Sequence, residues 1–158
     1  TELSSVAVHP GDCWVALDAI ADPGNLGTLL RTACATGIFS VVTSPGTVSC
    51  FNAKVVRASA ASLYSVPFLE SVALDELKRR RYQMWATAPL GGDSLFQTAF
   101  EPPAAFLMGN EGAGVDAAAL RAADRVVTIP MAEGSDSLNA GVAAALVMYE
   151  VYRQRSTL

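Results

Sequence analysis

The chain has 158 residues, of which 51% are hydrophobic and 16% are charged. This length and composition fit one globular domain and exclude an intrinsically disordered chain. The net charge of −4 counts against a domain that binds nucleic acid by itself, although it leaves room for a small basic cleft. No apolar run approaches the roughly 20 residues that a membrane-spanning helix needs, so we expect no membrane association.

Short apolar runs alternate with stretches of helical periodicity along the whole chain. In order, we predict a buried strand at 13–20, a helix over 26–34 that Gly37 terminates, a strand at 40–43, a helix at 53–63, an extended segment at 66–69, a helix at 74–81, strands at 83–88 and 104–108, a helix at 116–123, a strand at 126–129 and a helix at 138–155. This alternation predicts one α/β domain over 1–158, with a mostly parallel sheet flanked by helices.

The few cysteines and the single histidine limit which disulfide, metal and catalytic sites the chain can form. Cys13, Cys34 and Cys50 are odd in number, widely spaced and without a C-x-x-C pair, which argues against a disulfide framework and a zinc site. His9 is the only histidine, which removes most catalytic triads and histidine–metal sites. We therefore expect three free thiols and no metal ion.

The loop after the first strand carries an N-x-G-x-x-x-R pattern formed by Asn25, Gly27 and Arg31. On a structural interpretation, Asn25 caps the helix, Gly27 is a tolerated small residue and Arg31 is solvated. On a functional one, Gly27 permits close approach of a ligand or a neighbouring backbone. Arg31 would then lie away from the apolar stripe of the helix, free to reach a phosphate. The pattern alone does not decide between the two.

The loop after the strand at 104–108 reads Gly109-Asn-Glu-Gly-Ala-Gly. It matches neither a phosphate-binding loop with GK[ST] nor a dinucleotide fingerprint, and a bare glycine turn is the alternative. Glu111 at its tip would repel phosphates and suits hydroxyl or amine groups, such as those of a nucleoside. Because ligands bind beyond the carboxyl ends of parallel strands, we favour a ligand-binding loop.

The loop from Ile129 to Asn139 enters the last helix and gathers many polar groups. Its structural interpretation is an ordinary helix cap provided by Ser135, Asp136 or Ser137. Its functional interpretation is that exposed backbone N–H groups bind the edge of an adenine.

Together and in this order, the three loops resemble the three motifs of the SpoU (TrmH) family of SPOUT RNA 2′-O-ribose methyltransferases. The matching segments are Asp22-Pro-x-Asn25-x-Gly27-x-x-x-Arg31-Thr-Ala, Phe106-Leu-Met-Gly109-Asn-Glu111-Gly112-x-Gly114, and Ile129-Pro-Met131 followed by Ser137-Leu138-Asn139. The intervening Lys54-Val-Val-Arg57-Ala-Ser59 also follows family habit. A departure is Ala140-Gly141, where the family often has Val-Ser, and we expect it to alter packing at the start of the last helix.

The resemblance implies a SPOUT fold with a deep C-terminal trefoil knot, one of the known exceptions to unknotted topology. It also implies S-adenosylmethionine as cofactor, held by backbone around Gly109, Ile129, Met131 and Leu138, and a homodimer with its sites near the subunit interface. The implied reaction is methylation of a ribose 2′-hydroxyl in structured RNA, and we favour rRNA over tRNA. We expect a cytoplasmic location, because free thiols are typical of cytosolic proteins.

The resemblance also assigns catalytic roles. Asn25, Ser137 and Asn139 would orient groups, Glu111 would support the site, and Arg31 is the family's proposed general base. Because guanidinium groups have a pKa above about 12, we favour Arg31 first as a phosphate or ribose clamp.

Several alternatives stay open. The chain could be a family member that binds RNA or cofactor without catalysis, a SPOUT enzyme that methylates a tRNA base, or, apart from the resemblance, a flavodoxin-like nucleotide-binding module. Many relatives carry an N-terminal RNA-binding domain. Given the acidic composition, we expect one that is missing from this chain.

Overall fold

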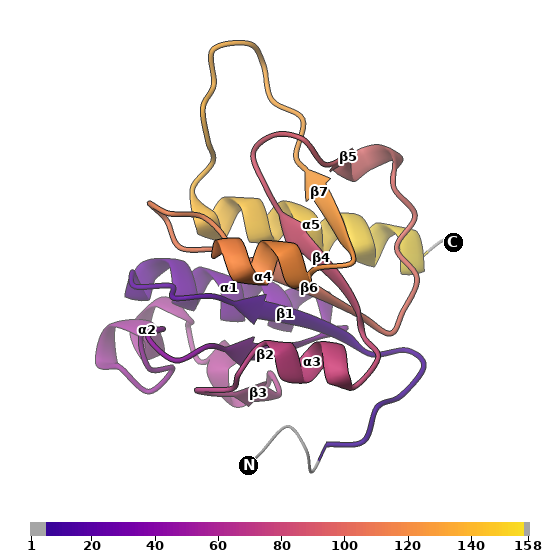
Figure 1. Ribbon diagram of the computed structural model, residues 1–158. Helices are drawn as coiled ribbons and strands as arrows, with labels where there is room; N and C mark the ends of the chain where they lie inside the picture. The colour runs from indigo at the N-terminus through magenta and orange to yellow at the C-terminus, as the bar shows by residue number, and fades with distance from the viewer. Residues whose placement is uncertain (1–5, 157–158) are drawn as a thin grey trace.

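The computed structural model describes residues 6–156 and contains one seven-stranded sheet in which every strand pair is parallel (Figure 1). The strand order is β3-β2-β1-β6-β4-β7-β5. The α/β prediction is therefore confirmed. The strands are β1 (Cys13–Leu17), β2 (Phe39–Thr43), β3 (Phe68–Leu69), β4 (Gln83–Thr87), β5 (Asp93–Ser94), β6 (Ala104–Met108) and β7 (Arg125–Thr128).

The helices lie on both faces of this sheet. They are α1 (Pro23–Thr36), α2 (Ala53–Ala58), α3 (Asp75–Arg79), α4 (Ala117–Ala122) and α5 (Ala140–Arg155), with short 3-10 turns η2 (Ser62–Tyr64) and η3 (Leu95–Gln97). Helix α1 packs against α2 and α5 on one face, and α3 packs against α4 on the other. None of the helices within residues 6–156 combines the length and apolar character needed to cross a bilayer.

Alternation along the strands explains the two-faced core. Cys13, Val15 and Leu17 of β1 point into the cluster beneath α1 and α5, while Trp14 and Ala16 point into the cluster beneath α3 and α4. All five are buried, as the central strand of a sheet covered on both faces requires.

The predicted helix over 53–63 is wrong in its second half. Helix α2 ends at Ala58, and Ala60 and Ala61 follow with φ values of 49° and 67°. This left-handed backbone turns the chain into η2, so it cannot continue an α-helix. The result brings Tyr64 to the surface close behind α2.

One other boundary and two short elements differ from expectation. Helix α5 begins at Ala140 rather than at 138, because Asn139 has an extended backbone and caps it. Strand β5 and turn η3 were not expected at all, since Asp93–Ser94 is a two-residue polar strand at the sheet edge.

Candidate functional site

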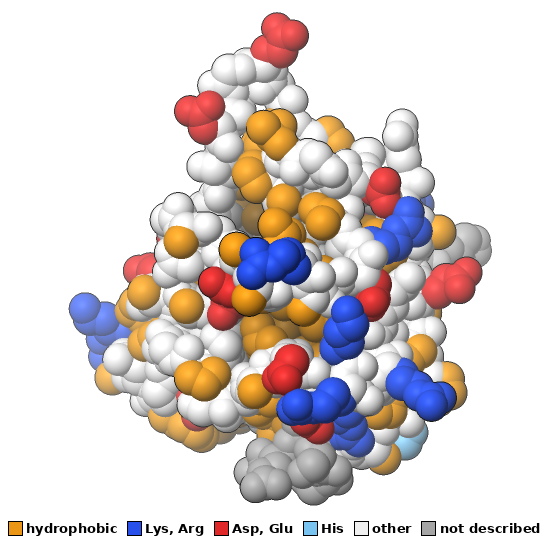
Figure 2. All heavy atoms as spheres, in the orientation of Figure 1, with side chains coloured by type: hydrophobic (Ala, Val, Ile, Leu, Met, Phe, Trp, Pro, Cys, Tyr) orange, Lys and Arg blue, Asp and Glu red, His pale blue; other side chains and the backbone are white. Residues whose placement is uncertain are grey.

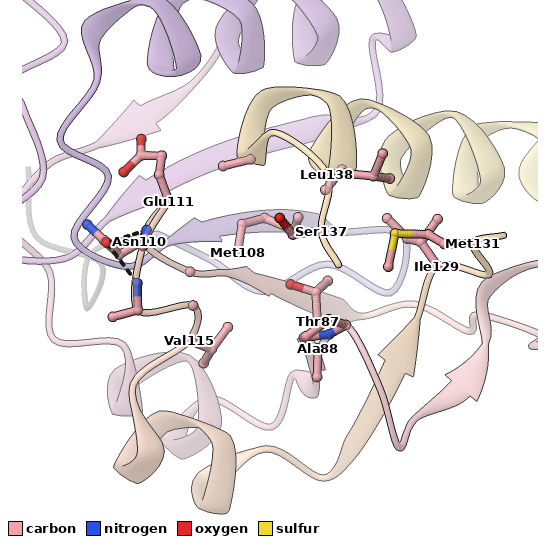
Figure 3. Close-up of a pocket in the computed structure, with 17 residues that line it drawn as sticks. Thr87, Ala88, Met108, Asn110, Glu111, Val115, Ile129, Met131, Ser137 and Leu138 are labelled. Atoms are coloured by element: carbon pink, nitrogen blue, oxygen red, sulfur yellow. Dashed lines mark hydrogen bonds between the residues drawn. The ribbon is translucent and has the colours of Figure 1, made fainter. Parts of the chain in front are cut away.

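A cavity of about 300 Å³ opens at the carboxyl ends of the central strands (Figure 3). Its walls come from the segments after β4 and β6, the loop between β7 and α5, and the first turns of α5. The lining residues are Thr87–Pro89, Met108–Val115, Ile129, Met131, Ser137, Leu138, Ala140 and Ala143. The location is where parallel α/β sheets bind ligands, and the volume reaches the lower end of ordinary small-molecule sites.

Asn110 organises the glycine-rich loop after β6. Its Oδ1 accepts hydrogen bonds from the backbone N–H groups of Gly112 (2.9 Å) and Ala113 (3.1 Å), and its Nδ2 donates to the carbonyl of Ala19 (2.8 Å). Its backbone pairs with Gly114 in both directions. The loop is thereby closed on itself and attached to the loop after β1.

Glu111 joins the first motif to the second. Its Oε1 accepts a hydrogen bond from Asn25 Nδ2 (3.0 Å) and from the backbone N–H of Asp22 (3.3 Å), and its Oε2 from the N–H of Ala21 (3.4 Å). Asn25 is only 7% exposed, so this carboxylate satisfies a buried amide. Two residues that the sequence assigned to separate loops thus form one hydrogen-bonded unit.

These contacts set the charge state of Glu111. Partial burial would raise the pKa of its carboxyl. The hydrogen bond from Asn25 and those from the backbone N–H groups of Glu111, Asp22 and Ala21 outweigh this effect and hold the pKa below its ordinary value. Glu111 therefore presents a stable negative charge at the mouth of the cavity.

The start of α1 explains how Asn25 is positioned. Asp22 is the N-cap and accepts the backbone N–H of Asn25 at 2.7 Å, with Pro23 in the first turn. Asn25 is therefore not the cap, and the structural interpretation given for it above is wrong. Its amide is left free to reach Glu111.

The two motif glycines serve backbone packing. A Cβ on Gly27 would lie 2.9 Å from the carbonyl carbon of Ala58 and 3.0 Å from the backbone nitrogen of Ser59, so Gly27 lets α2 approach α1. A Cβ on Gly109 would overlap with the backbone of Gly114 and Val115. Both sites need glycine because another stretch of chain occupies the space. Of the two neighbours that the sequence allowed at Gly27, a ligand or another backbone, the structure has the backbone.

Arg31 lies in the second half of α1 and is exposed, as the sequence predicts. It lines no part of the cavity, and its side chain has no partner among residues 6–156. Within a single chain, Arg31 therefore does not share the cavity lining with Glu111 and Ser137.

The third motif contributes one wall and one cap. Ser137 and Leu138 line the cavity, whereas Asn139 caps α5 by accepting the N–H groups of Gly141 (2.9 Å) and Val142 (3.2 Å). The alternative cap at Ser135, Asp136 or Ser137 is therefore wrong. Asn139 nevertheless lies close to the first motif, since a Cβ on Gly141 would be 3.1 Å from Asn139 Oδ1 and 3.3 Å from Asn25 Oδ1.

The four residues expected to hold a cofactor, Gly109, Ile129, Met131 and Leu138, all line the cavity. Figure 3 shows Glu111 and Asn110 towards one end and Met131 and Ile129 towards the other, with Ser137 and Leu138 between them. The arrangement provides an apolar wall beside a polar, negatively charged mouth.

Asn110 and the segment from Thr87 to Pro89 were not expected to contribute to the site. Asn110 was part of the quoted motif but received no role, although a side chain with both donor and acceptor in a glycine loop is suited to close it. The signal for Thr87–Pro89 was positional: these residues follow β4, whose carboxyl end shares a sheet edge with β6.

Comparison with known proteins agrees with the geometry. A sequence model of the SpoU rRNA Methylase family matches residues 12–149. The 23S rRNA (guanosine(2553)-2′-O)-methyltransferase RlmP of Bacillus subtilis is 38% identical over 138 residues, which are 85% of this chain and 56% of that protein. The chain thus spans little more than half the length of this relative.

Solved structures give the same result. The SpoU methyltransferase AviRb from Streptomyces viridochromogenes, in complex with the cofactor AdoMet, superposes with a TM-score of 0.89 at 32% identity, covering 99% of this chain and 62% of that one. An AdoMet-bound rRNA methyltransferase from Sinorhizobium meliloti gives a TM-score of 0.90 at 31% identity, and the match covers 100% of this chain and 62% of that one. With the family motifs gathered around one cavity, the chain belongs to the SpoU rRNA methylase family.

Proposed function

We propose that this chain is the catalytic domain of an S-adenosylmethionine-dependent enzyme that methylates a ribose 2′-hydroxyl in structured RNA, with rRNA favoured over tRNA. The observation that carries the proposal is the cavity at the carboxyl ends of the central strands. The second and third family motifs contribute to its walls, and Glu111 at its mouth accepts a hydrogen bond from Asn25 of the first motif. The names of the similar proteins support the reaction and the substrate class.

The cavity fits the chemistry of the cofactor. Ile129, Leu138 and Ala143 supply apolar contacts for a planar ring, while the ionised Glu111 at the mouth suits a cationic ligand. Bound there, S-adenosylmethionine would supply an electrophilic methyl group. Gly109 and Met131 complete the wall of the proposed binding site.

The remaining residues would act on RNA. Asn25 is held by Glu111, and Ser137 lies at the cavity, so both are placed to orient a ribose. Arg31, exposed and unpaired among the described residues, would clamp a phosphate. Asn139 would act from the cap of α5, beside Asn25.

Calorimetry with S-adenosylhomocysteine tests the cofactor site. The wild-type chain should bind it, and Ala143→Leu should abolish binding by filling the cavity. Ala145→Leu, on the same helix but outside the cavity lining, is the matched control and should bind normally. Absence of binding by the wild-type chain would contradict the methyltransferase proposal.

Nucleoside mass spectrometry tests the reaction. Ribosomal RNA incubated with the natural full-length protein and cofactor should gain a 2′-O-methylated nucleoside. A methylated base would instead indicate the SPOUT base-modifying alternative. Cofactor binding without methyl transfer to either rRNA or tRNA would indicate the non-catalytic alternative.

Three larger features belong to the same proposal. A homodimer is supported by the exposed apolar side of α5, which includes Val142 and Tyr149. The trefoil knot is what membership of the SpoU family implies. A cytoplasmic location is supported by the three free cysteines.

We also propose that an additional N-terminal RNA-binding domain serves this catalytic domain in the natural protein. Its support is the net charge of −4, because affinity for RNA depends largely on neutralising phosphates.

A further inference from the structure

Charge is unevenly distributed along the chain. The segment from Pro23 to Leu69 contains no aspartate or glutamate, although the whole chain has a net charge of −4. Its cations are Arg31 in α1 and Lys54 and Arg57 in α2, and all three are exposed. None of their side chains has an ion-pair or hydrogen-bond partner among residues 6–156.

Four cations elsewhere on helices and at the far sheet edge are paired with nearby carboxylates. The pairs are Lys78 with Asp124 (3.7 Å), Arg79 with Asp75 (3.0 Å), Arg125 with Asp93 (2.6 Å) and Arg153 with Glu150 (2.8 Å). Figure 2 shows red and blue side chains interspersed around α3, whereas cations project at the left edge, where Figure 1 places α2. The cations of α2 are thus free to meet an external anion.

Two highly exposed aromatic rings flank the same helix. Phe51, just before α2, is 64% exposed, and Tyr64, in the turn that follows it, is 74% exposed. Lys54 and Arg57 are three residues apart in α2, which places them on one side of the short helix, and Phe51 lies in the turn just before it. The ring of Phe51 is supported by an edge contact with Phe68 at 5.6 Å. We call Phe51, Lys54, Arg57 and Tyr64 the α2 surface.

The α2 surface is connected to the catalytic cavity. The chain that leads into α2 lies beside the loop after β1, through hydrogen bonds from Val48 N–H to the carbonyl of Ile20 (2.9 Å) and from Ala19 N–H to Ser44 Oγ (3.0 Å). That loop binds Glu111 at the cavity mouth. Figure 1 shows α2 on the same side of the molecule as the loop after β6.

We propose that the α2 surface binds unpaired nucleotides of the substrate RNA next to the nucleotide that enters the cavity. Phe51 and Tyr64 stack on two bases, and Lys54 and Arg57 contact the phosphates between them. Exposed aromatic rings interleaved with unpaired cations are how proteins hold single-stranded RNA with little sequence preference. The inference rests on the proposed function, because it assumes an RNA substrate.

Fluorescence anisotropy with a labelled single-stranded oligouridylate and a fully paired RNA hairpin tests this surface. The wild-type chain should bind the single strand more tightly than the hairpin. Phe51→Ala and Tyr64→Ala should each weaken single-strand binding about fivefold or more, as loss of one stacked base predicts. Lys54→Gln and Arg57→Gln should each lower the slope of log affinity against log salt by about 0.7.

Arg121→Gln is the matched control. Arg121 is also an exposed cation in the last turn of a six-residue helix, α4, and its replacement should change neither affinity nor slope. As a direct readout, 4-thiouridine placed in the oligonucleotide should cross-link within residues 51–64.

The outcomes separate this inference from the proposed function. S-adenosylhomocysteine should bind all α2 variants as it binds wild type. If it does, and the variants bind RNA like wild type or the cross-links map elsewhere, then the α2 surface does not bind RNA, while the methyltransferase proposal stands. The proposed RNA contact would also be contradicted if the wild-type chain bound neither RNA saturably below about 0.1 mM, which is the upper end of ordinary non-specific dissociation constants. Failure to bind S-adenosylhomocysteine would contradict the function itself.

Discussion

The hydrogen bond between Asn25 and Glu111 is the contact on which the candidate site depends most. It joins a buried amide on α1 to an ionised carboxylate on the loop after β6. The sequence supplies both residues through family motifs. It does not supply the bond, because the two are distant in the chain and meet only when β1 and β6 pair.

Asn25→Ala should raise the pKa of Glu111, because it removes the strongest hydrogen bond that favours the ionised form. In the wild type, the stability from this lowered pKa is fully present above the ordinary glutamate value of about 4.3 and is lost as pH falls through the lower folded-state pKa. The variant should lose less stability on acidification. NMR titration of the Glu111 carboxyl measures the shift.

Asn52→Ala is the control for this titration, since Asn52 caps α2 and does not contact Glu111. An unchanged Glu111 pKa in Asn25→Ala would show that the backbone N–H groups alone hold the carboxylate.

Gly109 and Gly112 form a matched pair in one loop. Gly109→Ala should destabilise the protein by about 1–3 kcal/mol, because its Cβ would overlap with the backbone of Gly114 and Val115. Gly112→Ala should stay close to wild type, since its Cβ would lie 3.6 Å from Asn110 Oδ1, an ordinary contact. Urea unfolding compares them, and equal stabilities would refute the packing role of Gly109.

At the scale of elements, the sequence predicts the central strands well and the short elements poorly. β1 and β6 are continuous apolar runs and β4 has an apolar centre, a pattern typical of strands buried on both faces. β5 is two polar residues held by its pairing with β7, so no local pattern marks it. After α2, local preference favoured a longer helix, but Ala60 and Ala61 adopt a left-handed backbone.

The start of α5 separates a structural role from a catalytic one. Asn139→Ala should cost about 1 kcal/mol in unfolding free energy, because it removes the cap of α5. Ser137→Ala should leave stability unchanged, since Ser137 is exposed, and should impair only methyl transfer if the family role holds. Urea unfolding together with activity measurements distinguishes the two. A fully stable Asn139→Ala variant would show that the cap contributes nothing.

At the scale of the whole molecule, α5 presents an apolar face to solvent. Val142 and Tyr149 do not lie on the core side of this helix. Ala144, Val147, Met148 and Val151 form that side, while Val142 is 47% and Tyr149 is 51% exposed. A second copy of the chain would cover such a face in a self-complementary interface.

Light scattering at micromolar concentration should therefore give a dimer mass, and Tyr149→Asp should shift it towards the monomer by placing a charge in the apolar contact. Leu90→Asp is the control, because Leu90 is exposed but lies in the segment between β4 and β5. A monomeric wild-type chain would contradict the proposed dimer.

The proposed N-terminal RNA-binding domain predicts a difference in RNA affinity. At equal salt, a protein that carries this domain should bind rRNA more tightly and with a steeper salt dependence than the 158-residue chain, while both bind S-adenosylhomocysteine equally. Filter binding with one rRNA fragment at several salt concentrations makes the comparison. Equal RNA affinity would show that the catalytic domain recognises its substrate without help.

The two margins of the sheet have a consequence for behaviour at high concentration. β3 and β5, the outermost strands, are two residues long each. They offer few unpaired backbone groups to a strand of another molecule, which is one way natural sheets avoid edge-to-edge aggregation. Lengthening β5 with a run of valines should therefore increase amyloid-like association relative to the unaltered chain, as measured by thioflavin fluorescence.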